Sequence, residues 1–131
     1  MIKRSLGLLA LLLVVLSGCQ GKPSIDGNWE GTLKIANPQA PGVEVELKVV
    51  VHLTKQSEGT YTATMDSPNQ GAKDIPIDTV TVKDGSVDLD VKKIAGNFHG
   101  KQSDDGNTIT GEWKQAAVNL PLTLKRVKEG N

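Results

Sequence analysis

The sequence predicts an all-β protein, an up-and-down barrel of about eight antiparallel strands behind a short N-terminal export signal. Three observations predict this fold class. From Gly27 onward, apolar residues recur at every second position, which is the period of a strand with one buried face. Turn-forming residues separate these runs at short, even intervals. No stretch of this part of the sequence shows a convincing 3.6-residue period, so no helix is expected.

The N-terminal segment has the layout of a secretory signal. Lys3 and Arg4 precede an apolar run over residues 6–16, and small residues follow in Ser17-Gly18-Cys19. The run is too short to span a bilayer, which takes about 20 apolar residues. With its cysteine at the cleavage point, Leu16-Ser17-Gly18-Cys19 resembles the lipobox of bacterial lipoproteins. The resemblance implies that Cys19 is lipidated and that residues 1–18 are removed.

This resemblance also implies a location and a division of the chain. The protein is expected to be exported and anchored to the cell membrane through the lipid on Cys19. In a Gram-negative host, Gln20 in place of an aspartate favours the outer membrane, facing the periplasm. Residues 19–25 are then the lipidated cysteine and a short polar tether, and residues 26–128 form a single β-barrel domain. Cys19 is the only cysteine, so no disulfide within the chain is expected.

The composition bounds the core and the partners. Without residues 1–18, the chain keeps 13 basic and 15 acidic residues, a formal charge of −2. Its lysines and arginines are dispersed, whereas a nucleic-acid-binding face needs them clustered, so no nucleic-acid partner is expected. Only four aromatic residues are present, and the core must therefore be built from valine, leucine and isoleucine.

Each predicted strand follows from its own alternating run. The inward positions are, in chain order, Trp29-Gly31-Leu33-Ile35, Val45-Leu47-Val49-Val51-Leu53, Tyr61-Ala63-Met65, Val87-Leu89-Val91, Ile109-Gly111-Trp113 and Leu120-Leu122-Leu124. The predicted turns between them are Glu58-Gly59, Asp84-Gly85 and Asp104-Asp105-Gly106-Asn107. A meander of this kind must protect its edge strands, and closing into a barrel removes the edges.

The two ends of the domain carry a family resemblance. Gly27-Asn28-Trp29 opens the first strand, and Arg126 ends the last strand on the face of its leucines. This pattern resembles the lipocalin (calycin) family, in which a basic residue on the last strand stacks on the tryptophan of Gly-x-Trp. The resemblance implies a cation–π pair between Arg126 and Trp29 that closes one barrel end. The alternative left open is a sandwich, with Trp29 as a core residue and Arg126 in solvent.

A second resemblance involves four spaced segments. Together they resemble the small all-β domain that precedes the catalytic domain of many exported bacterial α/β-hydrolases: residues 27–33 (GNWEGTL), 67–78 (SPNQGAKDIPID), 109–115 (ITGEWKQ) and 120–126 (LPLTLKR). The chain has no Gly-x-Ser-x-Gly nucleophile elbow. The resemblance therefore implies an accessory or binding role and assigns no catalytic residue.

Catalytic and metal sites are not expected. His52 and His99 are the only histidines, and the alternation turns both outward, away from any nucleophile. Residues 104–107 lack the spacing of a calcium loop and are predicted to form a hairpin turn. Asp88 and Asp90 share a strand face as solvated surface. The sequence predicts no cofactor.

Two features are candidates for ligand or partner contact. The first is the turn that contains Ser67, Asn69, Gln70 and Gly71, which is either a capped structural turn or a contact loop at the barrel rim. The second is the pair of Trp113 and Gln115, which share a strand face. The amide of Gln115 either pins the backbone or binds a polar group of a ligand.

The leading hypothesis is a membrane-anchored, non-catalytic lipoprotein whose barrel binds a small apolar ligand. The alternative is a protein-interaction module that docks on a separately encoded envelope hydrolase, and a hydrolase activity of the chain itself ranks last. Alternation is the same in a hollow barrel and in one filled by its own side chains, so the pattern leaves the cavity undecided.

Overall fold

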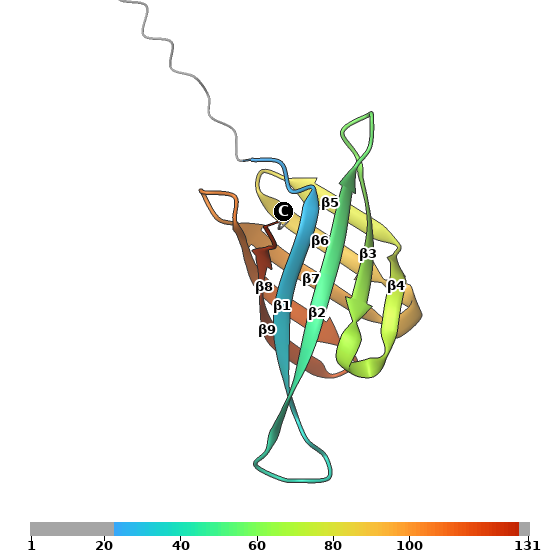
Figure 1. The fold of residues 1–131 in the computed structure, drawn as a ribbon, viewed down its shortest axis with the longest axis vertical. Helices are drawn as coiled ribbons and strands as arrows, with labels where there is room; N and C mark the ends of the chain where they lie inside the picture. Colours follow the sequence, from blue (N-terminus) through green and yellow to red (C-terminus); the bar gives the residue numbers. More distant parts are fainter. Residues whose placement is uncertain (1–22, 129–131) are drawn as a thin grey trace, which may run out of the picture.

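A single antiparallel sheet curls into a nearly closed barrel in the computed structural model, which describes residues 23–128 (Figure 1). Cys19 and the export signal lie outside the described residues. Within them, the sheet order is β4-β3-β2-β1-β9-β8-β7-β6-β5. The strands are β1 (Gly27–Ala36), β2 (Glu44–Lys55), β3 (Tyr61–Ser67), β4 (Ala72–Ile77), β5 (Thr79–Lys83), β6 (Ser86–Val91), β7 (Gly96–Gln102), β8 (Thr108–Gln115) and β9 (Val118–Arg126). Two short 3₁₀ turns, η1 (Pro68–Gln70) and η2 (Lys92–Ile94), join β3 to β4 and β6 to β7.

The barrel closes through a bend in the chain rather than through a hydrogen-bonded ladder. The two outermost strands of the sheet, β4 and β5, are consecutive and are separated only by Asp78. The Asp78 amide donates to the Asp90 carbonyl at 2.8 Å, and its carboxylate accepts from the Lys92 amide at 2.7 Å. These bonds move the chain from pairing with β3 to pairing with β6. Strands β4 and β5 thus act as one bent strand, which reconciles nine strands with the predicted eight.

The predicted inward face forms the core. Buried positions alternate along the strands as expected, and they include Trp29, Leu33, Val49, Val51, Leu53, Met65, Val87, Leu89, Val91, Ile109, Trp113, Leu122 and Leu124. The expectation is wrong for Val45, whose residue is 40% exposed. The β1–β2 hairpin continues past the barrel at the lower end of Figure 1, so its last apolar residues leave the core.

The sequence of β7 shows no alternation of aliphatic residues, because glycines occupy two of its inward positions. A Cβ atom on Gly96 would lie 2.4 Å from Cζ2 of Trp113, so the indole packs directly on the β7 backbone. Gly100 and Gly111 pair across β7 and β8, and their backbones also leave no room for a side chain. A Cβ on Gly111 would lie 2.0 Å from the His99 carbonyl oxygen. The absence of side chains lets β7 and β8 approach where the sheet bends.

The upper end of the barrel is closed by Arg126 and Trp29, the pair that the family resemblance implies. The Arg126 guanidinium carbon lies 4.4 Å from the centroid of the indole. Its Nη1 donates to the Asp26 carbonyl and its Nη2 to the Ser24 carbonyl, both at 2.7 Å. Gly27 precedes the tryptophan with φ +126°, a conformation that other residues rarely adopt. The first strand therefore needs glycine at this position to turn into the barrel beneath the arginine.

The segment before β1 is part of this closure, which corrects the expected tether. The Trp29 indole donates to the Ile25 carbonyl at 2.9 Å, and Gln102 Nε2 donates to the Pro23 carbonyl at 2.8 Å. With the two bonds from Arg126, side chains bind four consecutive carbonyls. Ile25 is only 2% exposed. Residues 23–25 were expected in the tether, but they fold across the barrel end because side chains of the barrel bind their carbonyls and Ile25 is buried there.

We expect Arg126→Met to lower the free energy of unfolding by about 2–4 kcal/mol, because it removes the cation–π contact and the bonds to three backbone carbonyls. Urea denaturation followed by tryptophan fluorescence measures this change. Lys125→Met is the matched control, since the neighbouring side chain is exposed. Equal stability of the two variants would contradict this account of the closed end.

A candidate apolar binding cavity

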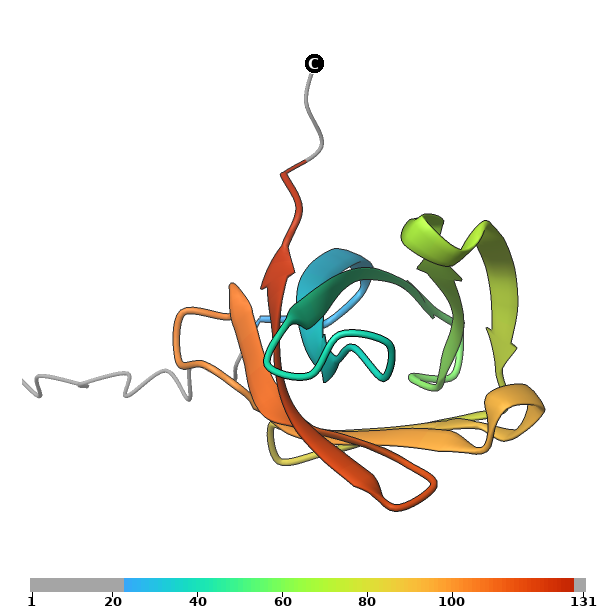
Figure 2. The ribbon, with the colours of Figure 1, turned by 90° about the horizontal axis from the view of Figure 1, so that it is seen from below.

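The end of the barrel opposite Arg126 holds a cavity of about 450 Å³. Its innermost walls are buried side chains from β1, β2, β3, β4 and β8, namely Leu33, Val49, Met65, Ile75 and Trp113. Half-buried Ile35, Leu47, Ile94 and Leu120 form its rim. Figure 2 views the molecule from this end, where the β1–β2 turn and the turns η1 and η2 lie.

The barrel is thus filled in one half and hollow in the other. Ile25, Trp29 and Phe98 are among the largest fully buried side chains, and none of them lines the cavity. Ile25 and Trp29 occupy the end closed by Arg126, and Phe98 pairs in register with Trp113 farther along the barrel. The cavity lies where smaller aliphatic side chains line the strands and where the β1–β2 hairpin leaves the barrel. Alternation alone could not reveal this division.

The structure brings four of the predicted contact residues to this cavity: Ser67, Gln70, Trp113 and Gln115. Ser67 is 5% exposed, and its hydroxyl donates to Oε1 of Gln70 at 2.9 Å. The turn is therefore a structural turn that also lines the cavity. Its 3₁₀ turn ends at Gly71, whose φ of +66° suits glycine.

Asn69 and Gly71 do not line the cavity. The Asn69 side-chain oxygen accepts from the backbone amide of Lys48 at 2.7 Å. Lys48 lies on β2 beyond the last residue paired with β3, so Asn69 supplies the acceptor that a neighbouring strand would otherwise provide. Asn69 is therefore better explained as an attachment of the turn to the barrel wall than as a ligand contact. The position of Asn69 next to Gln70 in the sequence could not reveal this structural role.

Gln115 acts as a pin on the backbone. Its Oε1 accepts from the Trp113 indole at 3.1 Å, and its Nε2 donates to the Ile94 carbonyl at 2.9 Å. The amide is exposed at the rim rather than buried, and it links β8 to η2. This geometry fixes the plane of the Trp113 ring in the cavity wall. Ile94, which the sequence analysis missed, is in a 3₁₀ turn with no periodic signal.

His52 is not the free surface histidine that was expected. Its Nε2 lies 2.9 Å from Oδ2 of Asp66 and its Nδ1 lies 2.7 Å from Oδ1 of Asn28, on the outer face of the barrel. The hydrogen bond from His52, followed by that from the Asp74 amide, holds the pKa of Asp66 below its usual 3.8. This geometry resembles part of a catalytic triad, but an asparagine stands where a nucleophile would be required.

The other polar candidates are surface features. His99 pairs with Asp88 on an exposed strand face. Asp105 accepts from the Ser103 hydroxyl and from the Asn107 amide, which lowers its pKa and closes the predicted hairpin turn. Within residues 23–128, no group of three or more histidine, cysteine, aspartate or glutamate side chains is arranged to hold a metal ion.

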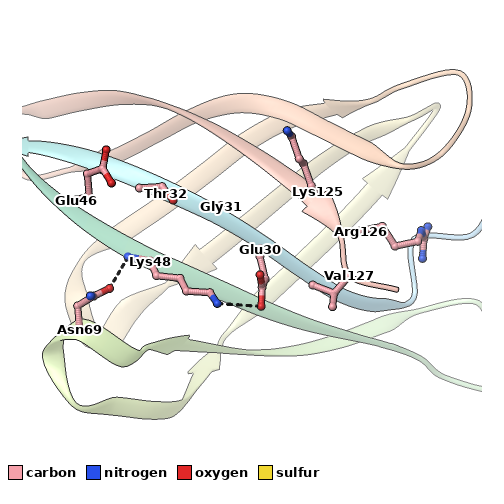
Figure 3. Close-up of a pocket in the computed structure, with 9 residues that line it drawn as sticks. All are labelled: Glu30, Gly31, Thr32, Glu46, Lys48, Asn69, Lys125, Arg126 and Val127. Atoms are coloured by element: carbon pink, nitrogen blue, oxygen red, sulfur yellow. Dashed lines mark hydrogen bonds and ion pairs between the residues drawn. The ribbon is translucent and has the colours of Figure 1, made fainter. Parts of the chain in front are cut away.

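A second hollow lies on the outer face of β9, β1 and β2 (Figure 3). Its side chains carry both charges: Lys48 Nζ lies 3.2 Å from Glu30 Oε1, and Lys125 and Glu46 lie on either side. Both partners of the ion pair are largely exposed to solvent. Such mixed, solvated charges select no particular ligand, so the apolar cavity is the better candidate site.

Comparison of the chain with protein-family models, with curated proteins and with solved structures finds no match. Between residues 23 and 128 there is no helix of the length and apolarity needed to cross a membrane. The function is therefore argued from the cavity and its surroundings.

We expect Asp66→Asn to lower the free energy of unfolding by about 1–3 kcal/mol at neutral pH, because the charged acceptor of His52 and of the Asp74 amide is lost. The pKa of Asp66 is depressed in the folded protein, so its contribution is present above pH 3.8 and is lost as the pH falls through the folded-state pKa. Urea denaturation at neutral pH and at steps below pH 3.8 measures the difference.

Asp88→Asn is the matched control, because it removes the carboxylate of the exposed pair with His99. An exposed ion pair contributes about 0–1 kcal/mol. A difference between Asp66→Asn and the unsubstituted protein that stayed constant down to the lowest pH would show that the charge of Asp66 plays no part.

Proposed function

We propose that this protein is a lipid-anchored, non-catalytic binding protein that holds a small apolar molecule in the open half of its barrel. The cavity carries the proposal. Its volume of about 450 Å³ falls in the range of roughly 300–1,000 Å³ typical of small-molecule sites. Its walls are aliphatic with one indole, and its few polar groups lie in a small part of the lining. The resemblance to the lipocalin family at Gly27, Trp29 and Arg126 supports the same function.

The anchoring part of the proposal depends on Cys19 and the lipobox residues before it. Pro23 lies at the closed barrel end, where Gln102 binds its carbonyl. Three residues lie between it and Cys19, so four residue steps join the two, and an extended chain spans at most about 3.6 Å per residue. A lipid on Cys19 therefore lies within roughly 15 Å of the closed end. In this arrangement the closed end faces the bilayer and the cavity opens away from it.

The alternative is a protein-interaction module for an envelope hydrolase. One observation favours it: Val43, Val45 and Val118 are exposed near the cavity opening, two of them on the projecting β1–β2 hairpin. A partner that covered these valines would also cover the opening. The absence of any cavity labelling in the experiment below would favour this alternative over ligand binding.

We expect an uncharged alkyl diazirine to label the full chain, on photolysis, at residues that line the cavity. Ala72→Phe places a ring in the opening and should reduce this labelling by about tenfold or more. Lys73→Phe is the matched control, because the next residue of β4 is exposed on the opposite face. Peptide mass spectrometry locates the label. Equal labelling of the two variants would contradict binding in the cavity.

We expect the closed end to lie nearer the bilayer than the cavity. Fluorophores attached after Asp104→Cys, in the β7–β8 loop at the closed end, should transfer energy to lipid-headgroup acceptors more strongly than fluorophores attached after Gln39→Cys in the β1–β2 turn. The two positions differ by about 20–30 Å along the barrel. Cys19→Ser should release both labelled proteins from the vesicles. Stronger transfer from Gln39→Cys would reverse the orientation.

A further inference from the structure

The cavity that would hold the ligand has no charged wall. Among the described residues that line it, the polar side chains are Ser67, Gln70 and Gln115, and no lysine, arginine, histidine, aspartate or glutamate is present. All three polar groups lie at the rim or just inside it. A ligand group that enters this region therefore meets hydrogen-bonding atoms but no compensating charge.

Most of the hydrogen-bonding capacity of these side chains is already used. Both ends of the Gln115 amide are bound, to Trp113 and to Ile94. Oε1 of Gln70 accepts from the Ser67 hydroxyl, and this bond orients the Gln70 amide. Its Nε2, which can only donate, has no hydrogen-bond partner in the described part of the chain. Gln70 is exposed to solvent, so the unused polar group is a neutral donor at the cavity opening.

A neutral donor in an apolar wall suits an uncharged oxygen acceptor. An ester carbonyl, a ketone or an alcohol can accept from Nε2 of Gln70 while its alkyl chain packs against Leu33, Val49 and Met65. An ionised carboxylate at the same position would lose part of its hydration as the ligand enters the cavity, and it would meet no cation among the lining residues. Burying an unpaired charge is far more costly than burying a hydrogen-bonded neutral group.

On the basis of the proposed binding function, we infer that the cavity selects uncharged alkyl compounds that carry an oxygen acceptor at one end over ionised fatty acids of the same length. The side chain of Gln70 donates to that oxygen, and Ser67 positions Gln70. Gln70 is therefore a specificity-determining residue of the cavity.

Competition against the diazirine label on the full chain tests this inference. Methyl decanoate and decanoate are the competitors at neutral pH, and the ratio of their half-maximal concentrations, corrected for partition into the membrane, is the measured quantity. The unsubstituted protein should prefer the ester by about tenfold or more. Gln70→Lys supplies the missing cation and should shift the ratio towards decanoate by about tenfold. Gln39→Lys adds the same charge in the β1–β2 turn, outside the cavity lining, and should leave the ratio unchanged.

A second variant keeps the inference testable if Gln70→Lys does not fold. Gln70→Met retains the size of the side chain without the donor, and it should abolish the preference for methyl decanoate over decane. Equal competition by ester and carboxylate in the unsubstituted protein would overturn the selectivity and leave the binding function intact. If Gln70→Lys and Gln39→Lys shifted the ratio of the two competitors equally, the effect would come from overall charge. That result would also overturn the role of Gln70 in selectivity. If neither compound displaced the label, the binding function itself would fail.

Discussion

Arg126 joins parts of the molecule that are about one hundred residues apart in sequence. Its guanidinium covers the Trp29 indole and binds carbonyls of the segment before β1 and of the β7–β8 loop. Arginine suits this position because its planar group stacks on an aromatic ring while its edge donates several hydrogen bonds. The first and last strands share only a short ladder, from Trp29↔Arg126 to Glu30↔Lys125. Gly31 of β1 also packs against Leu122 and the Thr123 carbonyl of β9, and Arg126 adds the side-chain bonds at the end of this contact.

Arg126 closes one end of the barrel, and the cavity opens at the other end. Ile25 and Trp29 are buried beneath Arg126. Towards the opposite end most inward side chains are aliphatic, with the Trp113 indole among them, and the longest hairpin leaves the barrel. The turns η1 and η2 then define the opening, each ending at a residue with positive φ, Gly71 and Ala95. A chain with few aromatic residues can therefore build a stable core in one half and keep a cavity in the other.

The sequence predicted the parts of this structure that depend on local pattern. Alternation located most inward positions, and Gly27, Trp29 and Arg126 indicated the closed end. Alternation could not identify β7, because Gly96 and Gly100 take inward positions where the backbone packs against Trp113, Phe98 and Ile109. It also could not show that Ile25 belongs to the core, since a single apolar residue in a polar segment has no period. The cavity depends on how far each side chain reaches across the barrel, which is a property of the closed fold.

The same segment connects the two halves of the proposed function. Residues 23–26 are bound by Gln102, Arg126 and Trp29, so the domain has no free hinge between the closed end and Pro23. On the proposed anchoring, only the residues between Cys19 and Pro23 separate the lipid from a rigid barrel. The cavity is then at the barrel end farther from the point where the lipid is attached. A molecule bound there would be exchanged with the aqueous space or with a facing surface, and an uncharged cavity wall matches ligands that are poorly soluble in that space.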